Sequence, residues 1–179
     1  MKIVIETERL RIRELELSDA IALSKVLCDR ESMKYYPREK TSEEVNAWIG
    51  RNIERYSKHG FGLWAVERKS DNEFLGECGI TLQNIDNEEL PEVGYHTIRA
   101  YCNKGYASEA AKACLRFGFR KFGFSAIYSY CNSANIPSRR VMEKIGMEKI
   151  KEYVGDGVCT VVYRTEIGRM APLEPGERE

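Results

Sequence analysis

Histidine and paired cysteines are what this sequence of 179 residues most clearly lacks. It contains two histidines, His59 and His96, and six cysteines that lie far apart with no Cys-x-x-Cys pair. A structural zinc site needs closely spaced Cys and His ligands, and a disulfide framework is typical of short secreted chains. We therefore expect no metal and no disulfides. The cysteines, expected to be reduced and mostly buried, are Cys28, Cys78, Cys102, Cys114, Cys131 and Cys159.

The sequence also lacks net charge and long apolar runs. Lys and Arg number 28, as do Asp and Glu, so the composition shows no electrostatic footprint for nucleic acid. No apolar run approaches the ~20 residues of a membrane span, and the N-terminus lacks the apolar core of a signal peptide. We therefore expect a cytoplasmic protein with no nucleic acid and no membrane among its partners.

Length and composition suit one globular domain. With 42% apolar residues, the chain can bury a core of its own, and it contains no internal repeat or linker. The C-terminal residues, with Pro172, Pro175 and Gly176, are typical of a loose tail. We expect a single domain over residues 1–168 and a tail over residues 169–179, in a monomer or a homodimer.

Two helices are expected in the N-terminal half. Ser18 is placed to cap a helix that ends near Cys28. Thr41 and Glu44 form a capping box for the second helix. Helical spacing gives that helix one apolar face, made of Val45, Trp48, Ile49, Ile53 and Tyr56.

Hairpins are expected in both halves of the chain. Segments 61–67 and 74–82 are rich in β-forming residues and flank a polar turn, which predicts a hairpin. Asp156-Gly157 is a strong two-residue hairpin signal between the last two strands.

A glycine-bearing turn that opens into an amphipathic helix is the most informative feature. Residues 102–110 read Cys-Asn-Lys-Gly-Tyr-Ala-Ser-Glu-Ala, after a predicted strand at 91–98. The N–H groups of a first helical turn lack intrahelical partners and the helix dipole adds positive charge, so such a turn suits a pyrophosphate. A plain strand-to-helix connection is the alternative. A strand at 125–131 and a short helix starting near Asn135 complete the order strand, turn, helix, strand, helix.

These motifs resemble those of the GNAT N-acetyltransferase superfamily, and more narrowly the ribosomal-protein alanine N-acetyltransferases. That branch has Ile-Gly-Tyr, a short gap and Trp-Gly-Lys-Gly-Tyr-Ala-Thr-Glu-Ala, against Val93-Gly94-Tyr95 and the turn at 102–110 here. The family's Asn-x-x-Ser-x-Arg-Val-x-Glu-Lys-x-Gly-Phe is matched from Asn135 to Met147, and Thr7-Glu8-Arg9-Leu10 resembles the branch's opening strand. The similarity spans residues 5–168.

The resemblance implies an α/β (α+β) fold with a central mixed, mostly antiparallel sheet, splayed at its fourth strand and flanked by helices. That strand carries Gly94, and Gly within a strand often marks close backbone approach. Two positions of the turn depart from the family pattern. Asn103 replaces a glycine, although Asn tolerates left-handed backbone, and Cys102 replaces Trp or Arg. A thiol near a helix N-terminus tends to have a lowered pKa.

The implied reaction is acetyl transfer from acetyl-CoA to a primary amine by direct attack in a ternary complex. Attack on a thioester requires a neutral amine, a dipolar site for the carbonyl and a proton for the departing thiolate. Glu92, at the start of the splayed strand, is the candidate base, and an exposed strand-end glutamate is the alternative. Glu77, a charged residue within an otherwise apolar strand, is the second candidate for the base.

The candidate acid is less usual. Many relatives have Tyr seven positions beyond the family's Asn, where this chain has Met142, so Ser138 is the candidate that donates to the thiolate. A helix-capping role for Ser138 is the alternative.

The remaining candidate site residues are those expected to contact the acceptor or acetyl-CoA. Acceptor contacts are expected from Tyr35, Tyr36, Trp64 and Glu77, and the first three could equally be core. The acceptor is a protein N-terminus or a small-molecule amine, with a catalytically silent acyl-CoA sensor as the alternative function. Acetyl-CoA contacts are expected from Tyr95, His96, Thr97, Asn103, Lys104, Gly105, Tyr106, Ala107, Ser108, Asn135 and Arg140.

Overall fold

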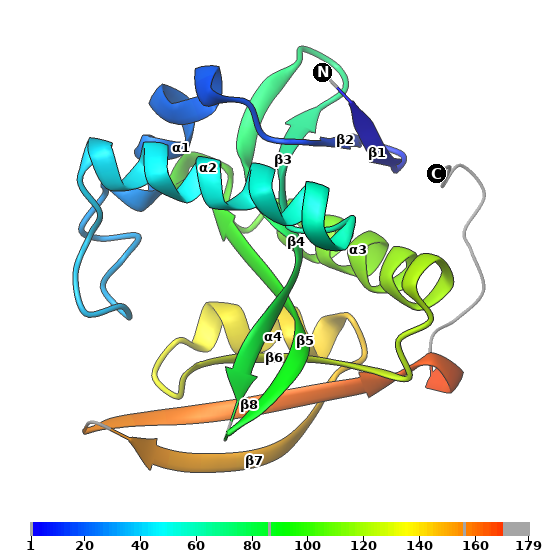
Figure 1. The fold of residues 1–179 in the computed structure, drawn as a ribbon. Helices are drawn as coiled ribbons and strands as arrows, with labels where there is room; N and C mark the ends of the chain where they lie inside the picture. The colour runs from blue at the N-terminus through cyan, green and yellow to red at the C-terminus, as the bar shows by residue number, and fades with distance from the viewer. Residues whose placement is uncertain (1, 86, 156, 170–179) are drawn as a thin grey trace.

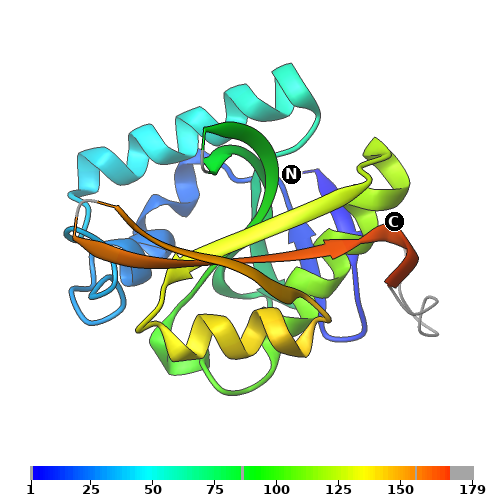
Figure 2. The ribbon, with the colours of Figure 1, turned by 90° about the horizontal axis from the view of Figure 1, so that it is seen from below.

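One continuous sheet with helices on both faces forms the protein (Figures 1 and 2). The structure is a computed structural model that describes residues 2–85, 87–155 and 157–169. Its eight strands follow the order β1-β2-β3-β4-β5-β6-β8-β7, and every neighbouring pair is antiparallel except β5 with β6. The mixed, mostly antiparallel α/β sheet expected from the sequence is therefore confirmed.

The N-terminal half contains a short η1 (Leu17–Asp19), α1 (Ala20–Leu27) and α2 (Ser42–His59). The capping box at α2 is confirmed, because Thr41 Oγ1 accepts from the N–H of Glu44 while the Glu44 carboxylate accepts from the N–H of Thr41. The expected Ser18 cap is wrong. Glu16 and Asp19 form the capping box of η1, and that short helix runs directly into α1.

The first five strands pair in chain order, and the hairpin expected from segments 61–67 and 74–82 is confirmed. β2 (Leu10–Arg13) pairs with both β1 (Ile3–Glu6) and β3 (Leu63–Arg68), and β4 (Glu73–Ile85) pairs with β5 (Glu88–Thr97) over ten register positions. Because β1 adds a strand at the edge, the family's fourth strand is β5 here. The hairpin loop residue Asp86 lies outside the described residues.

The C-terminal half provides η2 (Arg99–Tyr101), α3 (Tyr106–Phe122), β6 (Ala126–Asn132) and α4 (Ile136–Lys144). A final hairpin of β7 (Glu148–Gly155) and β8 (Val158–Glu166) precedes η3 (Ile167–Arg169). Gly157 follows β7 with φ of 74°, whereas its predicted partner Asp156 lies outside the described residues, as does most of the predicted tail.

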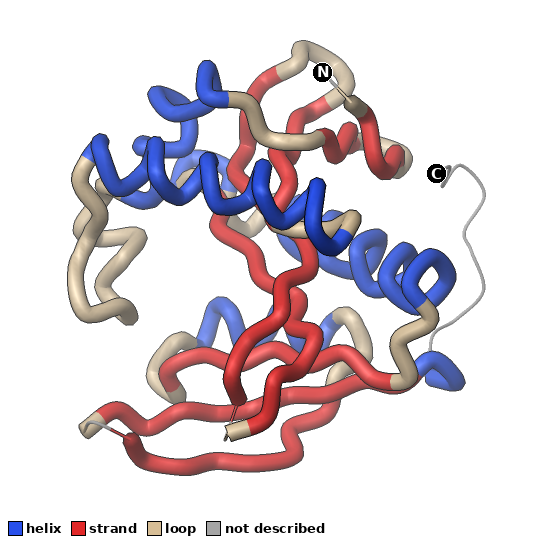
Figure 3. Tube along the Cα trace, in the orientation of Figure 1, coloured by secondary structure: helices blue, strands red, loops and turns tan. Residues whose placement is uncertain are grey.

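The sheet splays between β5 and β6, as expected. These parallel neighbours share one register position, Glu92 with Tyr128, and from Val93 onward β5 leaves β6. Figure 3 shows β4 and β5 crossing the molecule at a steep angle to β6, β8 and β7. Among the described strands, none pairs beyond Glu92 with the edge of β5 that faces away from β4.

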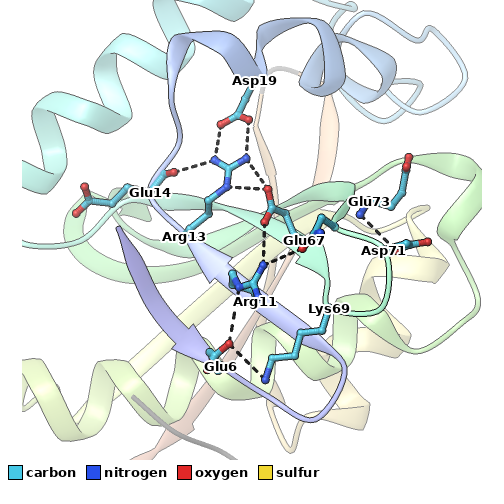
Figure 4. Close-up of polar contacts among 10 residues, drawn as sticks. Glu6, Arg11, Arg13, Glu14, Asp19, Glu67, Lys69, Asp71 and Glu73 are labelled. Carbon is cyan, nitrogen blue, oxygen red and sulfur yellow. Dashed lines mark hydrogen bonds and ion pairs between the residues drawn. The ribbon is translucent and has the colours of Figure 1, made fainter. Parts of the chain in front are cut away.

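Two apolar cores lie on opposite faces of the sheet. Trp64 and Val66 of β3 pack with α3 in the larger core, whereas Ala65 faces the smaller core under α1 and α2. A network of buried charges joins the N-terminal strands to η1 (Figure 4). Arg13 donates to both carboxylate oxygens of Asp19 at 2.7 Å and to Glu67 at 2.8 Å, which leaves this buried guanidinium fully paired.

Candidate active site

The turn before α3 has the backbone shape that the sequence predicts. Asn103 has φ of 61° and Gly105 has φ of 83°, so both occupy the left-handed region, and the expected tolerance of Asn there is confirmed. Gly105 is the N-cap of α3. The N–H groups of Tyr106, Ala107 and Ser108 follow at the first turn, where they lack intrahelical carbonyl partners.

A clamp from the N-terminal segment supports this turn. The Glu109 carboxylate accepts from Thr7 Oγ1 at 2.5 Å, from the Arg9 N–H at 3.1 Å and from Arg9 Nε at 2.7 Å. The Arg9 guanidinium also donates to the carbonyl of Lys104 at 3.2 Å and lies 4.7 Å from the centre of the Tyr106 ring. The sequence analysis identified the motif at residues 7–10 and the turn at 102–110, but it did not predict that they contact each other.

A cavity of about 250 Å³ lies beside the free edge of β5. Loop 35–36, α2, β4, β5, β6, α4 and β8 all contribute to its wall. The structure therefore brings together seven residues that the sequence assigned to three separate roles, namely Glu92, Ser138, Tyr95, His96, Asn135, Tyr35 and Tyr36.

Glu92 lines this cavity at the point where β5 separates from β6. Its side chain is buried, and Oε2 accepts a hydrogen bond from Thr81 Oγ1 at 3.2 Å. Burial raises the pKa of Glu92 from the ordinary 4.5 to about 7, although the Thr81 hydrogen bond and the charges of His96 and Arg55 lower it. The alternative of an exposed strand-end glutamate is wrong. A carboxylate with this pKa can accept a proton near neutral pH.

Ser138 lies across the cavity on the first turns of α4. Asn135 is the N-cap of this helix and its Oδ1 accepts from the N–H of Ser138 at 3.2 Å, so the capping role suggested for Ser138 belongs to Asn135. The Tyr95 hydroxyl donates to the carbonyl of Ser138 at 2.9 Å and lies 3.1 Å from Ser138 Oγ. Met142, which replaces the family's Tyr, is buried in the core.

Glu77 is held by two partners instead of facing the acceptor cavity. Its carboxylate accepts from Trp48 Nε1 at 3.0 Å and lies 2.9 Å from His96 Nδ1, and its side chain is fully buried. His96 Nε2 lies 2.9 Å from the Tyr36 hydroxyl. With a carboxylate at Nδ1, the neutral ring carries its proton there, and Nε2 accepts from Tyr36. Glu77 therefore does not line the larger cavity but lines a smaller neighbouring hollow, and its expected contact with the acceptor stays a prediction.

A second, smaller hollow lies between β5 and the start of α3. Tyr95, His96 and Thr97 of β5 line it together with Tyr106 and Ala107 of α3. Tyr95 and His96 line both hollows, so the two lie next to each other along β5.

Other candidate residues lie elsewhere. Trp64 is 1% exposed and packs edge-on against Phe117, so it does not wall the cavity; Trp48 of α2 does. Arg140 is exposed on α4, and Asn103 and Lys104 are exposed on the turn. The expected lowering of the Cys102 pKa is wrong, because partial burial raises the pKa of this thiol.

Similarity to known proteins agrees with this geometry. Residues 9–148 match the model of a family described as the acetyltransferase (GNAT) domain. The chain belongs to the GNAT acetyltransferase family. Among curated proteins, it is 37% identical over 150 residues to the uncharacterized N-acetyltransferase YnaD of Bacillus subtilis, covering 81% of this chain and 82% of YnaD.

Solved GNAT structures share the fold over almost the whole chain. A GNAT-family acetyltransferase from Bacillus anthracis superposes with a TM-score of 0.78 at 32% identity, covering 93% of this chain and 98% of that one. The ribosomal L7/L12 α-N-protein acetyltransferase RimL, solved in complex with coenzyme A, has a TM-score of 0.73 at 16% identity, covering 90% and 96%. At that identity RimL shows the shared fold and no more.

Two features of this GNAT chain complete the description. Within the described residues, no group of three or more His, Cys, Asp or Glu side chains is arranged to hold a metal ion. Among the described helices, none is long and apolar enough to cross a membrane.

Proposed function

We propose that the protein transfers the acetyl group of acetyl-CoA to a primary amine by direct attack in a ternary complex, with Glu92 as the base. The observation that carries this proposal is the buried Glu92 carboxylate, with a pKa of about 7, facing a cavity at the free edge of β5. A purely structural glutamate would gain nothing from such burial, because desolvation penalises its charged form.

Acetyl-CoA, when bound, supplies an activated thioester carbonyl. The first-turn N–H groups of α3 are suited to its pyrophosphate, since they are unpaired donors at a positive helix end. The unpaired edge of β5 at Gly94 and Tyr95 is suited to the extended arm that links the pyrophosphate to the thioester. The two hollows that share Tyr95 and His96 in their walls support this path.

Proton transfers are assigned to the two sides of the cavity. Glu92 accepts a proton from the acceptor ammonium, directly or through a water, and so delivers a neutral amine. The hydroxyls of Ser138 and Tyr95, 3.1 Å apart, can stabilise the departing thiolate and supply its proton. Burial raises the pKa of Tyr95, which keeps its hydroxyl protonated at neutral pH.

The test combines binding with turnover. Acetyl-CoA, but not NAD, is expected to raise the thermal midpoint of unfolding, and Gly105→Val is expected to abolish that rise, because a side chain is strained at φ of 83° and blocks approach to the turn. Release of free thiol is then followed across a panel of amines. Binding with no turnover on any amine would favour the sensor, and a midpoint unmoved by acetyl-CoA would overturn the proposal.

A further inference from the structure

Arg55 places a positive charge in the wall of the same cavity that Glu92 faces. Starting from the proposed function, we infer that the acceptor is an amine that also carries a carboxylate, with Arg55 binding the carboxylate while the amine lies at Glu92. The acceptors are therefore amino-acid-like compounds, whereas polyamines and other amines that lack a carboxylate are poor acceptors.

The guanidinium of Arg55 is anchored but largely unpaired. Within the described residues it makes one hydrogen bond, from Nη1 to Asn52 Oδ1 at 3.4 Å, and no ion pair. Asn52 is completely buried, accepts from the N–H of Leu63 at 2.9 Å and donates to the carbonyl of Trp48 at 3.0 Å. One long hydrogen bond to a fully buried residue therefore holds the guanidinium near the cavity wall and leaves most of its donors available to a ligand.

Paired donors in a planar fork match the two oxygens of a carboxylate. Other arginines in this chain already have such partners: Arg13 is bound by Asp19, and Arg38 by Glu44. Arg55 has no such partner in the described structure, although it is partly removed from water in the cavity wall. A ligand carboxylate would supply the missing partner.

The two charges belong to one electrostatic environment. Arg55 is close enough to Glu92 to lower the pKa of that carboxylate, against the larger effect of burial. A zwitterionic acceptor would present its ammonium to Glu92 and its carboxylate to Arg55. A polyamine would bring a second positive charge toward Arg55, and the two like charges would repel each other.

Two further cations reinforce this polarity. Lys40 Nζ lies 4.7 Å and the Arg51 guanidinium 5.6 Å from the centre of the Trp48 ring, and Trp48 itself lines the cavity. On the α2 side of the cavity, opposite in charge to Glu92, these cations favour the carboxylate end of a ligand. The volume of about 250 Å³ is shared with the thioester end of the donor, which favours an acceptor group of single-amino-acid size.

The test uses matched acceptors that differ only in the carboxylate. Phenylalanine, phenylalaninamide and phenethylamine form one set, and alanine, alaninamide and ethylamine another, joined by ω-amino acids and their amides to vary the spacing. We expect kcat/KM for the preferred carboxylate to exceed that for its amide by tenfold or more. Amidation lowers the pKa of a neighbouring amine and increases its neutral fraction, so intrinsic reactivity opposes this preference.

Arg55→Gln is expected to remove the preference by raising KM for the carboxylate; because both acceptors use the same Glu92 base, the carboxylate-to-amide ratio of kcat/KM cancels any shared effect of the substitution on Glu92. Lys58→Gln, an exposed position on the same helix, should keep the preference. Equal use of carboxylate and amide by wild type, or a preference that survives Arg55→Gln, would overturn the inference while leaving the proposed function intact.

A measurement without turnover separates the two hypotheses. N-acetylphenylalanine and its amide, which resemble reaction products, are titrated calorimetrically into the protein saturated with CoA. Tighter binding of the carboxylate in wild type but not in Arg55→Gln supports the carboxylate site even if no amine of the panel is acetylated. The same affinity for both ligands in wild type would contradict it.

Discussion

The Glu92 carboxylate lies against the backbone of Gly94, two residues further along β5. A Cβ at position 94 would be 3.1 Å from Glu92 Oε2 and 3.3 Å from Oε1. Alternation along a strand puts the two residues on the same face, so the missing side chain of Gly94 provides the space that the carboxylate occupies. This contact accounts for glycine here more directly than the general association of Gly with close approach in strands.

Gly94→Ala should therefore displace the Glu92 carboxylate by a few tenths of an ångström. We expect kcat to fall roughly tenfold, since small misplacements of a catalytic group are costly. Steady-state kinetics with a saturating acceptor measure this effect. Gly50→Ala is the matched control, because nothing lies within 4 Å of a Cβ there and alanine favours the helix. Full activity of Gly94→Ala would show that Glu92 has room to move without consequence.

Glu92→Gln should change the pH dependence of stability. The folded pKa of about 7 lies above the ordinary 4.5, so the folded state holds a proton that the unfolded state has released between these values. Wild type therefore loses stability as pH rises from about 4.5 to 7, by an amount on the order of 3 kcal/mol. The variant lacks this loss and should be the more stable protein at pH 8.

Urea unfolding at pH 5 and pH 8 measures that difference. Glu89→Gln, an exposed position on the same strand, serves as the control and should follow wild type at both values. If Glu92→Gln also follows wild type, Glu92 is not desolvated in the folded protein.

Ser138→Ala and Tyr95→Phe test the path of the proton to the thiolate. We expect Ser138→Ala to lower kcat by roughly tenfold or more, an effect typical of one positioned proton donor, with acetyl-CoA affinity within a few-fold of wild type. Because the two hydroxyls lie 3.1 Å apart, the double variant should lose less than the product of the single losses. Independent, multiplying losses would show that the hydroxyls do not act together.

Arg9→Ala should weaken acetyl-CoA binding without contacting the reacting atoms. Its guanidinium links Glu109, the Lys104 carbonyl and the Tyr106 ring, so its loss frees the turn before α3. We expect Kd for acetyl-CoA to rise roughly tenfold by calorimetry, equivalent to about 1.4 kcal/mol. Lys2→Ala breaks an exposed ion pair with Glu14 and should leave Kd unchanged. Equal effects of the two substitutions on Kd would show that the Arg9 contacts do not support acetyl-CoA binding.

The sequence correctly predicted those features that depend only on residues close together in the chain. The Thr41 capping box, the left-handed Asn103 and the helix start at Asn135 each depend on residues within a few positions of one another. Ser18 failed as a cap because Glu16 and Asp19 satisfy the same helix start with a reciprocal pair of hydrogen bonds. Where several possible capping residues lie close together, the sequence does not show which of them caps the helix.

Contacts between distant residues explain what the sequence did not predict. Trp64 was a candidate for the cavity wall, but β3 is covered on both faces, so its alternation places Trp64 in one core and Ala65 in the other. The partners of Glu77 lie 29 and 19 residues away, and those of Glu109 about 100 residues away. Periodicity within one element carries no information about such pairs.

The candidate site itself was largely predictable through the resemblance to the family. The positions of Glu92 and Ser138 followed from its motifs, and both face one cavity. Trp48 and Arg55 were missed as wall residues, because on a helix they look like an apolar-face residue and a solvated cation. Their exposure to the cavity depends on how α2 crosses the splayed β5.

The pH dependence of kcat/KM tests the role of Glu92 most directly. With an acceptor whose amine pKa lies well above 9, the wild-type profile should fall on its acidic side with an apparent pKa near 7, which reports the free enzyme's base. Glu92→Gln should lose that acidic limb together with most of its activity at pH 7. A limb that persists near pH 7 in a fully active Glu92→Gln variant would contradict the assignment of Glu92 as the base.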